Sequence, residues 1–241
     1  MIEVRRAAER GVAEHGWLTS RHTFSFGNYQ DPRQVGFSDL LVINDDRVVG
    51  GRGYGRHAHR DMEIVSYVIE GALEHEDTIG AGAVIRPGGV QIMSAGTGVA
   101  HTELNHSKTE EVHFLQIWIV PYRRGVAPRY QHVHVPQDSK RGRLKLIISP
   151  DAQDGSLGIH QDVRVYAGLF DGAESQVLEI PERRHAYVHV ARGTVLVNGL
   201  ALRDGDGARV REEPRLIVSD GDGAELLIFD LRPHETPQPP R

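Results

Sequence analysis

Two short segments of this sequence each place two potential metal ligands two residues apart. The first pair is His57 and His59, and the second pair is His101 and Glu103. Because residues two apart on a β-strand face the same way, each pair would point into one space while its neighbours point away. Three imidazoles and one carboxylate suit a first-row divalent ion such as iron, manganese, cobalt, nickel, copper or zinc. A six-coordinate ion held by these ligands would keep two positions open for substrate, water or dioxygen.

The chain holds 14 histidines, and for any single one a surface or core position is the simpler interpretation. The pair His132 and His134 has no partner pair and falls in a stretch rich in charge and proline, so we interpret both as solvated linker residues. The spacing of three further histidines does not distinguish ligands from ordinary polar positions: His75, His106 and His113.

The elements that must position the ligand pairs are short β-strands. Apolar segments of strand length, rich in β-branched and aromatic residues, occur at 40–43, 64–69, 114–120, 144–148 and 226–229. Turn signals lie between them, and 27 glycines with 12 prolines are typical of many tight turns. No long stretch keeps a helical period. The sequence therefore predicts an all-β fold.

A weak internal repeat indicates two such units in tandem. Residues 63–71 align with residues 185–193, and each segment reads as a strand, a glycine turn and the start of a second strand. We therefore predict two tandem antiparallel β-barrels, joined within 121–142. The expected division is a metal-binding N-terminal barrel at 1–135, a C-terminal barrel without metal ligands at 136–232 and a Pro-rich tail at 233–241 that does not pack.

Charge and composition exclude several classes of function. With 28 Lys and Arg against 33 Asp and Glu, the net charge is -5, so direct nucleic-acid binding is not expected. The absence of cysteine removes disulfides, thiolate metal sites and cysteine nucleophiles. No segment has the roughly 18 consecutive apolar residues of a membrane span. We expect a soluble, cytoplasmic and monomeric protein.

Longer motifs surround the two ligand pairs. Residues 57–71 read HAHRDMEIVSYVIEG, and further motifs lie at 17–26, 36–37, 91–98, 101–103 and 116–118. Together these motifs resemble the pirin family of the cupin superfamily. In the second half, residues 149–157 and 160–162 resemble the bacterial pirins that carry quercetin 2,3-dioxygenase activity.

The resemblance implies a bicupin whose first barrel holds the metal. The general cupin consensus is altered, since Gly71 lies one place too late and Ile92 stands where many cupins carry their last histidine. Pirins draw the fourth ligand from a His-x-Glu pair, which here matches His101 and Glu103. Glu63 is then expected to be a supporting or strand-face residue instead of a ligand.

The second barrel is expected to have lost the site. With Gly71 aligned to Gly193, the four ligand positions fall opposite Glu179, Pro181, Gly223 and Glu225. These residues cannot assemble the same ligand set. We expect this barrel to be structural, to pack against the first barrel and to cover its mouth.

The resemblance also implies an oxygenase. A flavonol such as quercetin would chelate the metal, O2 would add, and the heterocycle would open with loss of carbon monoxide. Glu103 would accept the flavonol proton, because a carboxylate at a divalent cation is ionised and can act as a base. Iron is the ion expected first, with manganese, cobalt, nickel, copper or zinc as the alternatives.

Two other functions stay open. Pirins are also associated with transcription-factor and enzyme partners, so the protein could be a metal-dependent regulator that acts through protein partners without catalysis. The fold and ligand set also fit a metal-bound cupin with another small substrate. An apolar pocket beside the metal would favour an enzyme, whereas a closed metal site beside a flat charged surface would favour the regulator.

Overall fold

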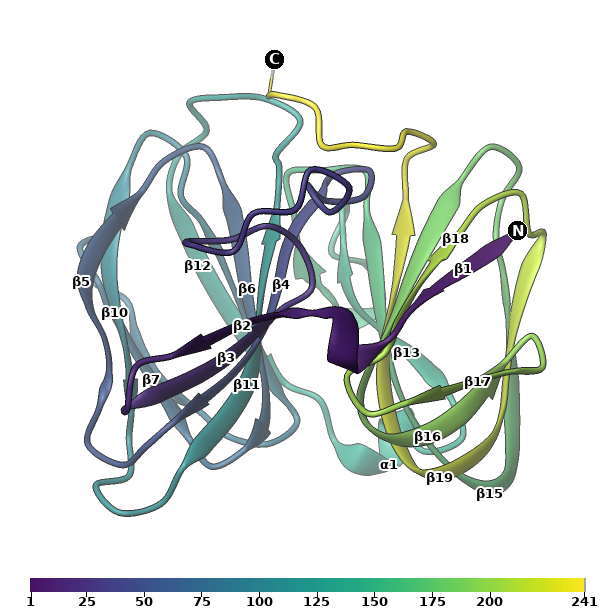
Figure 1. The fold of residues 1–241 in the computed structure, drawn as a ribbon. Coiled ribbons are helices and arrows are strands. Elements are labelled where there is room, and N and C mark those ends of the chain that lie inside the picture. Colours follow the sequence, from purple (N-terminus) through teal and green to yellow (C-terminus); the bar gives the residue numbers. More distant parts are fainter. Residues whose placement is uncertain (241) are drawn as a thin grey trace.

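The computed structural model describes residues 1–240 and consists of two β-barrels that stand side by side. In Figure 1 the N-terminal barrel, in purple to teal, lies on the left and the C-terminal barrel, in green to yellow, on the right. The central strands of both barrels pair in antiparallel fashion. The predicted all-β bicupin is therefore confirmed. No helix among the described residues has the length and apolarity that crossing a membrane requires.

The N-terminal barrel is built from two sheets. The larger sheet runs in the order β12-β9-β6-β11-β4-β3-β2 and the smaller in the order β5-β10-β7-β8. The strands of the larger sheet are β2 (Gly11–Glu14), β3 (Leu18–His22), β4 (Leu40–Val48), β6 (Glu63–Glu70), β9 (Gly89–Ser94), β11 (Val112–Ile119) and β12 (Arg129–His134). The strands of the smaller sheet are β5 (Gly53–His59), β7 (Leu73–Asp77), β8 (Gly82–Ile85) and β10 (Val99–Asn105).

The C-terminal barrel is a single eight-stranded sheet in the order β1-β18-β16-β19-β15-β13-β14, with β17 paired to β16. Its strands are β1 (Ile2–Arg5), β13 (Leu144–Ser149), β14 (Leu157–Gly158), β15 (Arg164–Glu179), β16 (His185–Val197), β17 (Leu200–Arg203), β18 (Gly207–Val210) and β19 (Arg215–Leu231). Helical structure is confined to the short helix α1 (Gln137–Lys140) and the 3-10 turns η1 (Ala7–Glu9) and η2 (Gln153–Gly155) among the described residues.

The two barrels share one apolar core, and strand alternation explains how. Along β6, Val65 and Tyr67 belong to the apolar cluster that also contains Phe229 of β19 in the other barrel. The intervening Ser66 and Val68 face the interior of the first barrel, where Ser66 bonds to an interior carboxylate and Val68 joins an interior cluster. Because both faces of β6 are buried, its sequence is a nearly continuous apolar run.

The interiors of the two barrels differ in polarity. The buried side chains inside the C-terminal barrel form an apolar cluster that includes Val188, Leu226 and Ile228. The interior of the N-terminal barrel holds smaller apolar clusters together with buried polar side chains, among them Gln91 and Glu103. A charged or metal-binding site is therefore compatible with the first interior.

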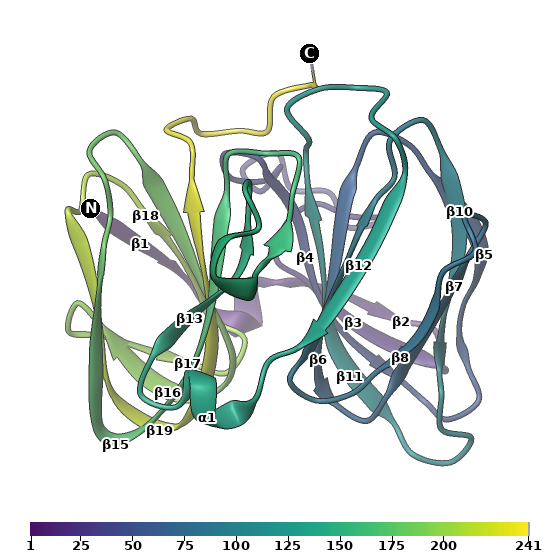
Figure 2. The same cartoon turned by 180° about the vertical axis from the view of Figure 1, so that it is seen from behind.

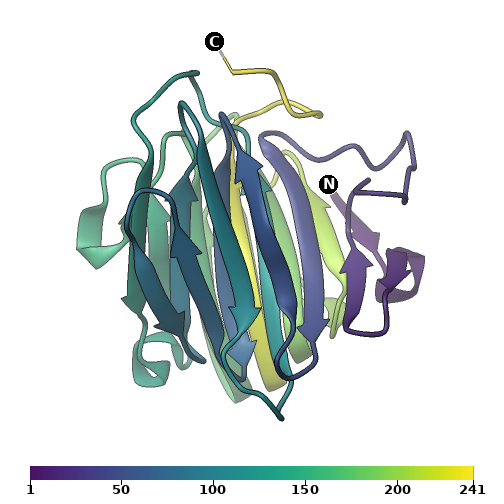
Figure 3. The same cartoon turned by 90° about the vertical axis from the view of Figure 1, so that its left-hand side faces the viewer.

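The C-terminal barrel packs against the larger sheet of the N-terminal barrel, because the apolar cluster between the barrels draws on β4, β6, β9 and β11. The smaller sheet, with β5 and β10, lies on the far side from the second barrel (Figure 1). Figure 3 views the molecule with this side of the N-terminal barrel in front. The expectation that the second barrel covers the mouth of the first was therefore wrong, because the apolar face available for burial belongs to the other sheet.

The glycine turns of the internal repeat are matched in conformation. Gly71 has φ 75° and Gly193 has φ 74°, a left-handed conformation that side chains disfavour. A side chain at Gly71 would collide with the carbonyl oxygen of Glu111, and one at Gly193 with that of Gly223. Gly223 therefore occupies the position that Glu111 occupies in the first barrel. The segment that leads from the glycine turn to this position is shorter in the second barrel. The alignment that set Glu225 opposite Glu103 therefore does not hold beyond the hairpin.

The predicted linker is partly a strand. Residues 129–134 form β12, which pairs with β9 of the first barrel in antiparallel register. His132 and His134 are exposed strand residues, so their interpretation as linker histidines was wrong. The connection between the barrels is the segment that contains α1, visible from behind in Figure 2.

Both ends of the chain join the barrels in ways that composition did not predict. The first strand, β1, pairs with β18 of the C-terminal barrel, so the chain begins there and enters the first barrel at β2. The described part of the Pro-rich tail, residues 233–240, also packs: Glu235 pairs with Arg211 at 2.7 Å, and His234 lies 3.2 Å from Asp39. Residue 241 of the expected tail lies outside the described residues. The expectation of an unpacked tail was wrong, because the polar side chains between its prolines form ion pairs and hydrogen bonds with both barrels.

A buried ionic network fixes α1 against both barrels. The ammonium group of Lys140 donates to the Tyr67 hydroxyl of the first barrel at 2.6 Å and to Glu225 of the second barrel at 3.0 Å. Tyr67 also donates to Glu225, and Arg192 pairs with the other oxygen of that carboxylate at 2.8 Å. Since Lys140, Tyr67 and Glu225 are almost fully buried, each charge depends on its partners. The network therefore couples the linker helix to the docking of the two barrels.

Candidate metal centre

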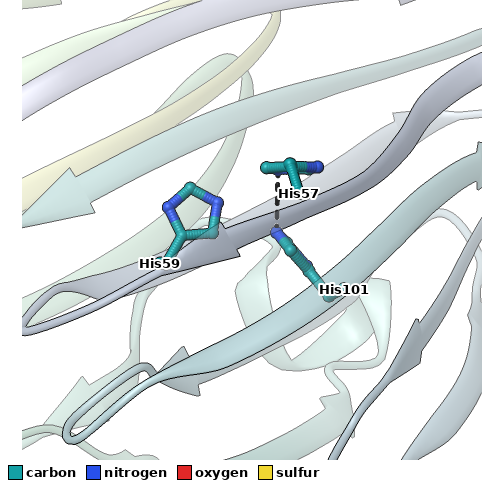
Figure 4. Close-up of side chains that lie close together, drawn as sticks. All are labelled: His57, His59 and His101. Carbon is teal, nitrogen blue, oxygen red and sulfur yellow. Dashed lines mark hydrogen bonds between the residues drawn. The ribbon is translucent and has the colours of Figure 1, made fainter.

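Three imidazoles converge on one face of neighbouring strands in the smaller sheet. β5 and β10 pair in antiparallel register, which sets His101 directly opposite His57. The Nε2 atoms of these two residues lie 3.1 Å apart. The ring centroid of His59 lies 4.8 Å from that of His57 and 5.0 Å from that of His101. Figure 4 shows the three rings gathered on the same side of the two strands.

Strand alternation produces this convergence locally. His57 and His59 are partly buried, whereas Arg56 and Ala58 between and beside them are exposed. On β10, His101 is buried and the next residue, Thr102, is only partly so. The period of two predicted from the sequence is therefore present on both strands.

Burial keeps two of these imidazoles, His59 and His101, in the form that binds metal. Burial, assisted by the neighbouring His101 and His57, lowers the pKa of His59 to about 4. Burial, with the nearby His57 and His75 rings, lowers the pKa of His101 to about 3. Both rings are thus neutral near pH 7, and neutral imidazole nitrogens are the metal ligands.

The geometry of the histidines fits a divalent transition-metal ion. Two nitrogens bound at about 2.1 Å in neighbouring coordination positions lie about 3 Å apart. The 3.1 Å between the Nε2 atoms of His57 and His101 matches this separation. The ligand atoms of His57, His59 and His101 all lie within 4.8 Å of one another. Metal identity is not fixed by this donor set, because imidazole suits several first-row ions.

Glu103 lies beside this cluster in the interior of the barrel. One of its oxygens groups with one ring nitrogen of His101 and one of His75, all within 4.8 Å of one another, so His101 is common to the two groupings. The carboxylate is buried and accepts hydrogen bonds from Ser66 at 2.7 Å, Gln91 at 3.0 Å and Gln116 at 2.9 Å. These neutral donors satisfy the carboxylate without cancelling its charge.

Sequence reasoning did not single out the residues that support Glu103 and His101. His75 and Asp77 follow the same period of two as the ligand pairs, so a His-x-Asp pattern on a strand was an available signal. Ser66, Gln91 and Gln116 carry no such signal, because their relevance depends on three strands that meet Glu103 in space.

The departure from the cupin consensus at Ile92 has a simple explanation. Ile92 faces the apolar core between the barrels, while its neighbour Gln91 faces the interior and bonds to Glu103. A ligand at position 92 would therefore point away from the candidate metal centre.

The remaining histidines of the first barrel lie in other surroundings. His106 pairs with Glu74 at the surface, and His113 bonds to the buried Asp45 at 2.6 Å. Neither of the two metal-type groupings among residues 1–240 contains these residues, His132 or Glu63. Both groupings lie in the N-terminal barrel.

Two cupin barrels in tandem, with a histidine cluster in the first, define a bicupin. The sequence matches the Pirin family over residues 2–119 and the quercetinase C-terminal cupin domain over residues 146–231. The chain belongs to the pirin family.

Relatives with this architecture are known in bacteria. The chain is 46% identical over 233 residues to the quercetin 2,3-dioxygenase of Escherichia coli K12, a match that covers 97% of this chain and 100% of that protein. The structure of the bacterial pirin YhhW from Escherichia coli in complex with nickel(II) is 44% identical, with a TM-score of 0.92 over 97% of this chain and 100% of that one. A quercetin 2,3-dioxygenase structure from Acinetobacter baumannii, 21% identical over 92% of this chain and 84% of that one with a TM-score of 0.75, shares the fold.

The histidine cluster predicts which substitutions remove a metal. His101→Ala should lose bound metal because it deletes the residue common to both groupings, whereas His132→Ala, on an exposed face of β12, should retain it. Elemental analysis of both proteins after the same purification checks this. Equal metal content in the His101→Ala and wild-type proteins would reject the assignment.

A second prediction concerns Glu63, which is fully buried and accepts a hydrogen bond from Ser94 at 2.9 Å. Burial raises the pKa of Glu63 to about 7, so its contribution to stability falls as pH rises from about 4.5 to 7. Glu63→Gln should keep its metal and should lose less unfolding free energy than the wild type between pH 5 and pH 8, by about 1–3 kcal/mol. Urea unfolding at both pH values measures the difference, and parallel pH profiles for the two proteins would contradict it.

Proposed function

We propose that this protein is a metal-dependent dioxygenase that cleaves the heterocycle of flavonols such as quercetin with O2 and releases carbon monoxide. The observation that carries the proposal is an aromatic cavity whose wall touches the histidine cluster. The names of the bacterial relatives support the same reaction.

The cavity has a volume of about 790 Å3, within the usual range of small-molecule sites. It is lined by Val12, Ala13, His15, Trp17, Leu18, Ser20, His22, Phe26, Gly27, Asn28, Tyr29 and Tyr54. Aromatic rings supply flat apolar walls, and the polar side chains among them can hydrogen-bond a hydroxylated ligand. A planar polyphenol fits this lining.

Two contacts connect the cavity to the histidines. The ring of Tyr54 lies 6.2 Å from that of His57. Phe26 packs edge-on against Trp118 at 5.4 Å, and Trp118 packs edge-on against His59 at 5.1 Å. Tyr54 therefore separates the cavity from the proposed metal ligands, and a flavonol that chelates the ion would extend past it from the cavity to the histidines. A second hollow of about 650 Å3, around Pro181, His185 and Pro214, is lined by none of the proposed metal ligands.

The proposed ligands are His57, His59, His101 and Glu103. Iron is the ion we expect first, and nickel, which occupies a related bacterial pirin, is among the alternatives with manganese, cobalt, copper and zinc. When bound, such an ion supplies Lewis acidity toward a chelating substrate and a route for electron transfer to O2.

Glu103 is the proposed base. Its oxygens accept hydrogen bonds from three neutral donors, and a carboxylate held in this way can accept the 3-hydroxyl proton of a flavonol. Removal of that proton leaves the electron-rich flavonolate that reacts with O2. The side chains of the cavity hold the substrate rings and exclude water from them.

A metal-dependent regulator that acts through protein partners is the alternative function. That function would be favoured by a closed metal site beside a flat charged surface. The open aromatic cavity beside the histidines instead supports an enzyme.

The Glu103→Gln substitution tests the proposed base. The amide cannot accept the flavonol proton, so turnover of quercetin should fall on the order of 10²-fold or more, and further than metal content falls. O2 uptake and metal content must be measured in the same preparation, because loss of a ligand also removes metal. Full turnover by a metal-loaded Glu103→Gln protein would exclude the residue from proton transfer.

The cavity makes a separate prediction about substrate binding. Trp17 lines the cavity and packs edge-on against Tyr54 at 5.4 Å. Trp17→Ala should raise KM for quercetin about tenfold, as expected from the loss of one aromatic contact, while metal content stays unchanged. The control is Tyr122→Ala, an exposed aromatic residue outside the cavity. An unchanged KM in Trp17→Ala would contradict this location of the substrate.

A further inference from the structure

A chain of buried polar groups runs from His101 into the wall of the first barrel. The Nδ1 atom of His101 lies 3.4 Å from Nδ1 of His75. The Nε2 atom of His75 in turn lies 3.1 Å from Oδ2 of Asp77. The side chains of His75 and Asp77 have no exposed surface, so water cannot serve as an alternative partner.

Asp77 sets the direction of the hydrogen bonds in this series of side chains. Its other oxygen, Oδ1, accepts hydrogen bonds from the backbone N–H groups of Ile79 and Ala81, both at 2.9 Å. These two bonds hold the carboxylate in one orientation. Because an ionised carboxylate only accepts hydrogen bonds, the proton between Asp77 and His75 must belong to Nε2 of His75.

The remaining proton positions follow from that one. A neutral His75 with its proton on Nε2 has a lone pair on Nδ1, so it accepts a hydrogen bond from Nδ1–H of His101. His101 then has its lone pair on Nε2, the atom that faces Nε2 of His57. Nδ1 of His57 lies 2.7 Å from the carbonyl oxygen of Gly55 and must donate to it, so Nε2 of His57 also carries a lone pair and the two lone pairs face each other, as a shared cation requires. Tyr130 stacks on His75 with 4.4 Å between ring centroids and 17° between planes, which fixes the plane of the relaying ring.

We infer that Asp77, acting through His75, is a positioning residue that fixes the tautomer of His101 and so keeps Nε2 of His101 available to a metal. The inference rests on the proposed role of His101 as a ligand. Neither His75 nor Asp77 touches the ion in this arrangement. Outer partners of this kind typically change metal affinity 10- to 100-fold when they are replaced.

Asp77→Asn tests the inference because the amide has the same shape as the carboxylate. It would reverse the direction of each hydrogen bond between residue 77, His75 and His101. The two backbone N–H groups still require an oxygen at Oδ1, so the amide nitrogen faces His75 and donates to Nε2. The proton of His75 then moves to Nδ1, and His101 must accept there and carry its own proton on Nε2. That proton occupies the position where the metal would bind.

The first measurement is Ni(II) binding to the metal-free protein in competition with a chromophoric chelator. Asp77→Asn should bind Ni(II) about 10- to 100-fold more weakly than the wild type. The matched control is Glu74→Gln on the same strand, where Glu74 pairs with the exposed His106 at 2.8 Å, and this variant should bind Ni(II) as the wild type does. Equal affinity in Asp77→Asn and wild type would overturn the inference.

The second measurement needs no variant. Long-range ¹H–¹⁵N correlation spectra of the Zn(II)-loaded wild type should show His101 with its proton on Nδ1 and His75 with its proton on Nε2. An Nδ1–H tautomer for His75, or coordination of Zn(II) by Nδ1 of His101, would overturn the inference, even if Asp77→Asn failed to fold.

Neither measurement uses quercetin or O2, so absence of oxygenase activity would count against the proposed function and leave the inference standing. A wild type that bound no Ni(II) and no Co(II) would overturn both.

Discussion

The pleat of the β-strand is the constraint on which the other features of this protein depend. It sends alternate side chains to opposite faces, and in β6 both faces are buried: Tyr67 faces the second barrel and Ser66 faces the interior of the first. The same alternation sends His57, His59 and His101 to one face of the smaller sheet. Packing between the barrels and convergence of the histidines are therefore two outcomes of a single geometric rule. A one-residue shift of any of these strands would exchange its apolar and polar faces.

Two buried glutamates show how the two parts of the fold use charge differently. Glu225 forms ion pairs with Lys140 and Arg192, which balance its negative charge and hold α1 against both barrels. Glu103 is held by a hydroxyl and two amides, which satisfy its oxygens and leave its charge uncompensated. A buried carboxylate in that state is stabilised by a cation, which supports a metal near Glu103 and a purely structural role for Glu225.

The arrangement of the barrels separates stability from chemistry. The larger sheet of the first barrel is committed to the apolar core between the barrels, and the apolar interior of the second barrel adds to the same framework. The smaller sheet is free of that contact, and the cavity that reaches the histidines through Tyr54 is lined by residues of the first barrel alone. Substrate access and metal binding can thus vary without disturbing the interface.

The sequence by itself determined the strands, the tandem barrels and the placing of the proposed ligands at a period of two, because these depend on local alternation and on motifs such as residues 57–71. It did not determine that β1 joins the second barrel, that residues 129–134 form a strand or that the tail packs. Nor did it determine that His101 stands opposite His57, or that Gln91, Gln116 and His75 meet the ligands. These features depend on which distant strands pair and in which register. Strand pairing and register are set by burial of the apolar surface of the whole protein, so they cannot be read from any local segment of the sequence.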